Sequence, residues 1–414
     1  MQTVSPQDRG LESARLDHIN TWMQRYVDER KYPGSALLIA RGGDEVYFNA
    51  TGQRNLKENL PFQRDTVARI YSMTKPITSV ALMMLAERGL FHLAAPVSDF
   101  IPAFANMQAL IPGATSLDQT EPCATPTLHQ LLTHISGLSY SFNPGLVPEM
   151  MAEQKRDFGP SKVTLAEMTD QLAAMPLAFK PGSRWEYSVG IDIIGRVVEV
   201  VSGKTLDQFF ADEIFGPLAM TETAFNTPNG VGDRLASLYT PLDGNTITLG
   251  TGNGSTDTLR LMEDQEKSAY HVTKMRSGGG GLLSTIDDYM TFVEMLRRRG
   301  AYDGGRLLSP KTVDFMMLNH LPGDIASMGT ESFAEQPTEG MGFGLGGSVV
   351  INPGLVGVPS SVGDFSWGGV ASTFFWIDRE LDLSVVFMTQ LLPSSAYPTR
   401  AELKALVHGA LIND

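Results

Sequence analysis

The sequence contains a single cysteine, Cys123, among its 414 residues. One thiol excludes an internal disulfide and cannot by itself build a thiolate metal site, so packing alone must hold the fold. We expect Cys123 to be a small buried residue. The seven histidines show no His-Glu-x-x-His or comparable spacing. We therefore expect no metal and no other cofactor.

Positive charge is also in short supply. Lysine and arginine number 32 against 46 aspartates and glutamates, which gives a formal net charge of -14. Such a surface repels phosphate backbones and anionic membranes, so we expect neither nucleic acid nor a membrane surface as a partner. The composition, 42% hydrophobic and 19% charged, is that of a globular enzyme with one large core or two merged cores.

Long apolar runs are absent. No stretch approaches the roughly 18 apolar residues of a membrane span. Residues 1–10 are polar and lack the apolar region of a secretory signal. We expect a cytoplasmic enzyme, although a processed N-terminus would give the same pattern. The sequence does not indicate its oligomeric state.

Strand patterns lie at both ends of the chain, with helical patterns between them. Apolar residues at helical spacing predict a helix over 11–30, and a second helix is expected over 400–411. Strand-like runs bounded by turn residues predict strands over 35–40, 45–51, 341–351, 372–377 and 383–389. Residues 95–262 combine short helical patterns with loops rich in proline and glycine. This order favours one sheet assembled from the two ends of the chain, with a helical domain inserted.

The first candidate site is Ser72-Met-Thr-Lys75, placed where an almost wholly apolar helix over 76–85 begins. Positions i and i+3 share a helix face, so the Lys75 amine can reach the Ser72 hydroxyl. A desolvated lysine has a lowered pKa and can act as the base that a serine nucleophile needs. The pattern alone also fits an ordinary helix start. No Gly-x-Ser-x-Gly elbow is present, which argues against an α/β-hydrolase.

Two further motifs follow. Tyr187 precedes a helical pattern over 191–201 and can aim its phenol into a cleft as a second proton carrier, although a structural tyrosine also fits. Trp367-Gly368-Gly369-Val370 precedes a strand. Its glycines permit close backbone approach, so the Val370 N–H can join that of Ser72 in an oxyanion hole. A simple turn fits this tetrapeptide as well.

The order of these motifs resembles the serine β-lactamase and penicillin-binding protein superfamily, in its class C branch. Matching segments extend over nearly the whole chain and include 89–102, 131–138, 195–203, 215–220 and 279–289. The resemblance implies an α/β fold with an antiparallel sheet flanked by helices. It implies an α/β domain of residues 1–80 and 231–414, a helical domain of residues 81–230, and an active site in the cleft between them.

The resemblance also implies roles for individual residues. Ser72 would be the nucleophile, Lys75 and Tyr187 the base pair, and the Ser72 and Val370 amides the oxyanion hole. Val189 stands where class C enzymes have an asparagine that binds the β-lactam side-chain amide. Trp367-Gly368-Gly369 replaces Lys-Thr-Gly, so a substrate carboxylate would lose a charge-assisted hydrogen bond. This variant is similar to the family VIII carboxylesterases.

We therefore expect hydrolysis of small-molecule carboxylic esters, short-chain ones in particular, through an acyl-enzyme. Trp367, Gly368, Gly369 and Val189 are the expected substrate contacts, with Trp367 as an apolar wall. A weak β-lactamase, a D-peptidase, an acyltransferase and a catalytically silent scaffold are the alternatives. His134 is expected to have a structural hydrogen-bonding role. Residues 277–281 lack the Gly-Lys-[Ser/Thr] of a phosphate loop and should form a turn before a helix over 285–298.

Overall fold

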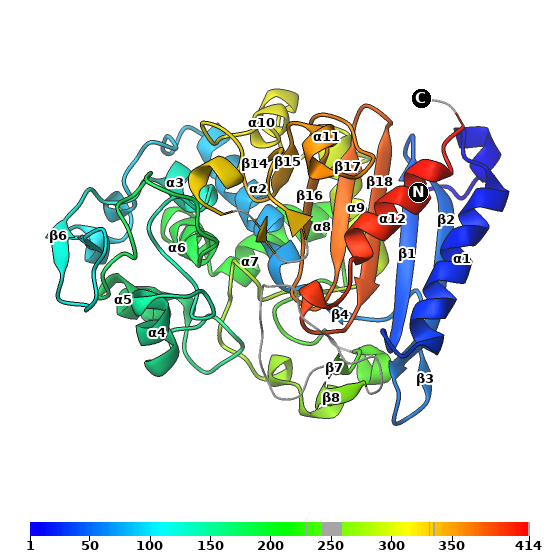
Figure 1. Cartoon of the computed structure of the whole chain (residues 1–414), viewed down its shortest axis with the longest axis horizontal. Coiled ribbons are helices and arrows are strands. Elements are labelled where there is room, and N and C mark those ends of the chain that lie inside the picture. Colours follow the sequence, from blue (N-terminus) through cyan, green and yellow to red (C-terminus); the bar gives the residue numbers. More distant parts are fainter. Residues whose placement is uncertain (229, 242–258, 331, 334–335, 413–414) are drawn as a thin grey trace.

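A computed structural model of the chain describes residues 1–228, 230–241, 259–330, 332–333 and 336–412. Its centre is an antiparallel sheet of eight strands in the order β14-β15-β16-β17-β18-β1-β2-β3 (Figure 1). The strands are β14 Met341–Phe343, β15 Ser348–Val350, β16 Phe365–Gly368, β17 Phe374–Asp378, β18 Leu383–Thr389, β1 Gly34–Arg41, β2 Asp44–Asn55 and β3 Leu60–Pro61. The two ends of the chain therefore meet in one sheet, at the β18–β1 pair.

Helices cover both faces of this sheet. α1 (Ser13–Asp28) and α12 (Thr399–Gly409) lie on one face, and α9 (Ile286–Arg297) packs on the other (Figure 1). The alternation of β1 explains this arrangement: Leu37 and Ile39 enter the core under α1 and α12, whereas Leu38 enters the large core on the opposite side. The predicted α/β fold with an antiparallel sheet flanked by helices is confirmed.

α2 (Thr74–Glu87) runs through the middle of the molecule and is buried from Thr74 to Leu85. Its apolar composition on all sides makes this placement favourable. α6 (Gly190–Ser202) packs against it. The remaining helices are α3 Leu128–Leu132, α4 Leu146–Glu153, α5 Leu165–Ala173, α7 Leu206–Phe210, α8 Gly216–Leu218, α10 Pro310–Met316 and α11 Pro353–Val356.

Short strand pairs complete the described part of the chain. They are β4 Ala68–Arg69 with β9 Leu283–Ser284, β5 Gln108–Leu110 with β6 Thr120–Pro122, β7 Leu238–Thr240 with β8 Arg260–Glu263, β10 Ala301–Tyr302 with β11 Gly305–Arg306, and β12 Ser332–Phe333 with β13 Gln336–Pro337. No helix among the described residues is long and apolar enough to cross a bilayer.

Several local expectations need correction. The strand predicted over 341–351 is a hairpin, because Gly346 adopts φ 96° and turns the chain between β14 and β15. The tripeptide precedes a strand, β17, as expected, but Trp367 and Gly368 also lie in a strand of their own, β16. Cys123 is partly rather than fully buried. The division into an α/β and a helical domain remains a proposal, and its expected boundary between residues 80 and 81 falls inside α2.

Candidate active site

Ser72 sits in a short 3-10 helix, Tyr71–Met73, immediately before α2. The preceding residue, Tyr71, has φ 43°, in the left-handed region that only glycine adopts at little cost. Such strain, about 1–3 kcal/mol, persists only where the surroundings fix the chain, and it clusters at functional sites. The Tyr289 hydroxyl donates to the Met73 carbonyl (2.8 Å) and helps to fix this turn.

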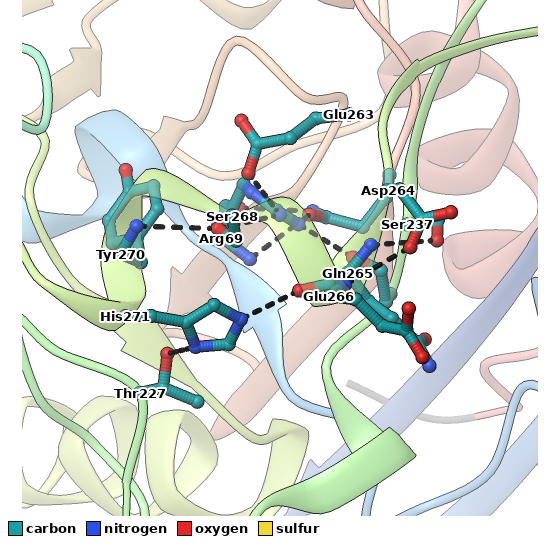
Figure 2. Close-up of polar contacts among 12 residues, drawn as sticks. Arg69, Thr227, Ser237, Glu263, Asp264, Gln265, Glu266, Ser268, Tyr270 and His271 are labelled. Atoms are coloured by element: carbon teal, nitrogen blue, oxygen red, sulfur yellow. Dashed lines mark hydrogen bonds and ion pairs between the residues drawn. The ribbon is translucent and has the colours of Figure 1, made fainter.

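A buried arginine anchors the strand that leads into Ser72. Arg69, on β4, is fully buried. Its guanidinium donates to Glu263 Oε1 (2.6 Å), Ser268 Oγ (3.1 Å) and the Ala236 carbonyl (2.6 Å). Figure 2 shows this group at the centre of a polar cluster that continues to His271. A buried guanidinium is costly to leave without partners, so these contacts hold β4 in place.

Lys75 lies one helical turn after Ser72, as the spacing predicts. Its ammonium group is fully buried and donates to Ser72 Oγ (3.2 Å), Tyr140 Oη (3.0 Å) and the Gly279 carbonyl (2.7 Å). Burial lowers the pKa of Lys75 to about 7, while the nearby carboxylate of Asp192 opposes this shift. Near neutral pH, a substantial fraction of Lys75 is therefore uncharged and able to accept a proton.

A buried carboxylate supports Lys75 from α6. Asp192 Oδ1 accepts hydrogen bonds from Ser277 Oγ (2.5 Å) and from the Gly279 N–H (3.0 Å). Gly279 in turn presents its carbonyl to Lys75. Burial raises the pKa of Asp192, and the positive charge of Lys75 opposes that rise. The turn at 278–280, expected from the sequence, thus connects a carboxylate to the candidate base.

Tyr187 approaches the same serine from the segment before α6. Its Oη donates to Ser72 Oγ at 2.6 Å, and its side chain is almost fully buried. Lys75 Nζ lies 4.5 Å from the centre of its ring. Burial raises the pKa of Tyr187, and the neighbouring side chains of Ser72 and Trp367 work against that rise. The lysine and the tyrosine therefore converge on one hydroxyl.

The glycines of the third motif allow two close approaches. A Cβ on Gly369 would overlap the Ile70 carbonyl, and one on Gly368 would overlap the guanidinium of Arg400 in α12. The tripeptide therefore lies directly against the chain that carries Ser72. Among the described residues, the N–H groups of Ser72 and Val370 have no hydrogen-bond partner. Both residues line the same cavity, where an oxyanion can bind them.

That cavity has a volume of about 540 Å³. Ser72, Tyr187, Trp367, Gly368, Gly369 and Val370 all contribute to its wall. Further wall residues are aromatic, among them Tyr140, Phe142, Phe158 and Phe333. Small-molecule sites commonly have this size and a largely apolar lining with a few polar groups. Its wall draws on both predicted domains, which supports the proposed cleft between them.

Known proteins resemble the chain over almost its full length. The family model described as Beta-lactamase matches residues 19–409. The chain belongs to the beta-lactamase family. Esterase EstB of Burkholderia gladioli is 31% identical, covering 92% of this chain and 91% of its own. The lovastatin esterase of Penicillium rubens is 31% identical, covering 93% and 96%.

A solved structure of a hydrolase also aligns with the chain. EstCE1, described as a hydrolase with promiscuous acyltransferase activity, superposes with a TM-score of 0.78 at 28% identity, covering 97% of this chain and 99% of its own. The predicted resemblance to β-lactamase-like esterases is thereby confirmed. This member of the beta-lactamase family is a hydrolase or acyltransferase.

Val189 is not where a substrate contact would be. It is fully buried at the N-terminal end of α6, its N–H bonds to the Ser139 carbonyl (3.3 Å), and it is not among the residues of the cavity wall in the described chain. Its role is to begin the helix that carries Asp192. The absence of an asparagine there still leaves the beta-lactamase-like site without that side-chain amide.

A cation does reach the cavity, contrary to the expectation from the missing lysine of Lys-Thr-Gly. Trp367 replaces the lysine of Lys-Thr-Gly, but Arg400 reaches the cavity from α12 beside Gly368. Positive charge is thus supplied from another element. His134 is buried, and its Nδ1 accepts from the Ser188 N–H (3.2 Å), a structural contact. Among the described residues, no three His, Cys, Asp or Glu side chains gather as metal ligands.

Sequence reasoning missed Tyr140, Asp192, Gly279 and Arg400. Asp192 had a usable signal, because it is one acid within the apolar run Ile191-Asp-Ile-Ile194. Buried acids are nearly always paired or functional. Tyr140 and Arg400 had no sequence signal, because distant segments of the chain bring them to the cavity.

Proposed function

We propose that the protein is a serine carboxylesterase that hydrolyses small-molecule esters, short-chain ones in particular, through an acyl-enzyme on Ser72. The convergence of Tyr187 Oη (2.6 Å) and Lys75 Nζ (3.2 Å) on Ser72 Oγ carries this proposal. A serine hydroxyl becomes a useful nucleophile only when a neighbouring base takes its proton. Both groups are within reach of that proton.

The reaction proceeds in two halves. Ser72 Oγ attacks the ester carbonyl while its proton passes to the Lys75–Tyr187 pair, and the oxyanion binds the N–H groups of Ser72 and Val370. Collapse of this intermediate expels the alkoxide, which takes the proton from the pair. Water then attacks the acyl-enzyme, gives a proton to the pair, and releases the acid as Ser72 is reprotonated. The two groups titrate together.

Three features favour esters over β-lactams. Val189 leaves the site without a side-chain amide at that position. Trp367 gives the cavity an apolar wall beside Tyr187. Two relatives with 31% identity carry esterase names. The positive charge of Arg400 means that the missing Lys-Thr-Gly lysine adds little to this preference.

Acyl transfer to an alcohol is the second candidate. The similarity to EstCE1 and the aromatic wall of the cavity favour it. An apolar wall binds water weakly, which favours an organic alcohol as the acceptor of the acyl group. Product partitioning to a small alcohol at concentrations far below that of water would identify a transferase. If the acyl group instead divides between water and the alcohol in proportion to their concentrations, the enzyme is a hydrolase.

The experiment is a steady-state comparison of p-nitrophenyl esters of increasing chain length with a chromogenic cephalosporin and a D-alanyl-D-alanine peptide. We expect the esters to turn over fastest, and Ser72→Ala to abolish their turnover. Faster cephalosporin or peptide turnover would replace the esterase by a β-lactamase or a D-peptidase. Unchanged ester turnover in Ser72→Ala would remove Ser72 from the reaction, and a lack of all turnover would favour a silent scaffold.

A further inference from the structure

Trp367 packs inside an aromatic cluster around the candidate base. Its ring centre lies 5.5 Å from that of Tyr187, 5.5 Å from that of Phe333 and 5.2 Å from that of Phe343. The side chain is only 7% exposed. A role as an apolar wall explains the position of the ring, but it does not explain why the indole N–H is buried there.

The indole N–H of Trp367 has no hydrogen-bond partner among the described residues. Buried donors are paired in the great majority of native structures, and an exception calls for an explanation. Trp376 also has an unpaired N–H and contributes to the same cavity wall, but its ring stacks on Phe374 and His408 rather than packing against Tyr187. Trp185 also has an unpaired N–H, and its ring centre lies 6.4 Å from that of Tyr187. Trp367 differs from both because it lies closer to Tyr187, at 5.5 Å, and contributes to the cavity wall beside it.

We propose that the Trp367 indole N–H is a donor to the Tyr187 oxygen that stabilises the phenolate formed during proton transfer. Trp367 would thus be a positioning residue for acyl transfer as well as a wall of the cavity. This inference rests on the proposed function, since it requires Tyr187 to act as a proton carrier.

The resting state explains why the contact is unformed there. Tyr187 Oη is a neutral phenol that donates to Ser72 Oγ, and a neutral phenol oxygen is a weak acceptor. When Tyr187 gives up its proton, the oxygen becomes charged, and hydrogen bonds to charged acceptors are shorter and about twice as strong. Burial raises the pKa of Tyr187, whereas the neighbouring side chains of Ser72 and Trp367 lower it, which is the direction expected of a donor close to this oxygen.

The test removes the N–H and keeps the aromatic wall. In Trp367→Phe we expect kcat/KM to fall about tenfold, the factor that corresponds to one pKa unit, and by the same factor for p-nitrophenyl acetate, butyrate and octanoate. The acidic limb of the pH profile, which reports the coupled Lys75–Tyr187 pair, should move to higher pH, because the phenolate has lost a donor. Trp376→Phe is the matched control and should leave the pH profile unmoved.

A second variant excludes a packing defect. Benzothienylalanine at position 367 has the shape of tryptophan but carries sulfur in place of N–H, and it should reproduce the uniform loss and the pH shift. A loss that grows with acyl length while the pH profile stays fixed would overturn the inference and leave Trp367 as a wall only. So would full activity of the sulfur variant. Ser72→Ala tests the proposed function separately, since that variant keeps Trp367 and changes only the nucleophile.

Discussion

At the scale of single residues, the chemistry depends on the charge of Lys75. Burial lowers the pKa of Lys75 to about 7, against the opposing effect of Asp192. A lysine acts as a base only when it is neutral. The acidic limb of the kcat/KM profile should therefore lie near pH 7, with activity rising as Lys75 loses its proton.

Asp192→Asn tests this electrostatic coupling. The carboxylate favours the protonated form of Lys75, so its removal should lower the pKa of Lys75 and move the acidic limb to lower pH. The amide oxygen can still accept from Ser277 or Gly279. Asp157→Asn changes an exposed carboxylate of the cavity wall and should leave the limb in place. An unmoved or upward-moving limb in Asp192→Asn would contradict the coupling.

Much of the site was predictable at this scale because it depends on local spacing. Ser72 and Lys75 are one helical turn apart, and a helix geometry brings them together whatever surrounds them. The proximity of Tyr187, Trp367 and Val370 to them was implied by the order of the family's motifs. Val189 was predicted to contact the substrate, but its side chain is buried in the core. The direction of a side chain at the start of a helix cannot be read from the order of motifs.

At the scale of elements, the site depends on how closely the turn at 278–280 packs onto α6 and α2. A Cβ on Gly278 would lie 2.9 Å from the Ile191 carbonyl oxygen and 3.1 Å from Thr78 Cγ2. The Gly278 carbonyl also accepts from Thr78 Oγ1 at 2.7 Å. The turn, α6 and α2 are therefore one packed unit, and the Gly279 carbonyl that holds Lys75 belongs to it.

Gly278→Ala should loosen this unit. Overpacking of this kind costs about 1–3 kcal/mol, and the displaced turn should also reduce kcat. Gly409→Ala, in α12, is the control: nothing lies within 4 Å of its Cβ position, and alanine raises helix propensity by up to about 1 kcal/mol. Urea unfolding of both variants measures the difference. Equal midpoints would show that the turn is not tightly packed.

Long helices with a regular or continuous run of apolar residues were the easiest elements to predict. The structure has α1, α2, α6, α9 and α12 close to their expected ranges. β16 was missed because Trp367, Gly368 and Gly369 have the composition of a turn, and only pairing with β15 and β17 makes this segment a strand. Such pairing partners lie far away in the sequence.

At the scale of the whole molecule, two histidines connect the inserted helical region to the sheet region. His129 Nε2, on α3, lies 3.1 Å from His320 Nδ1, and His320 Nε2 lies 2.8 Å from the Phe315 carbonyl oxygen. Burial lowers the pKa of both rings, and the charge of His320 lowers that of His129 further. The pair is therefore stable in its neutral form.

This pair makes stability depend on pH in a defined direction. Because the folded pKa values lie below the unfolded value of about 6.5, the contribution is complete above that pH and is lost as the pH falls below it. We expect the urea midpoint of His320→Asn to fall less between pH 8 and pH 5 than that of the wild type. His18→Asn, at an exposed position of α1, should behave like the wild type. Parallel slopes in all three proteins would contradict this role.

The proposed reaction depends on Ser72 being the group that carries the acyl chain. The most direct measurement is mass spectrometry of the intact protein after treatment with a slow ester or a fluorophosphonate, followed by peptide mapping. We predict one adduct, located on the peptide that contains Ser72 and absent from Ser72→Ala. An adduct on another residue, or continued ester turnover with Ser72 unmodified, would contradict the proposed reaction.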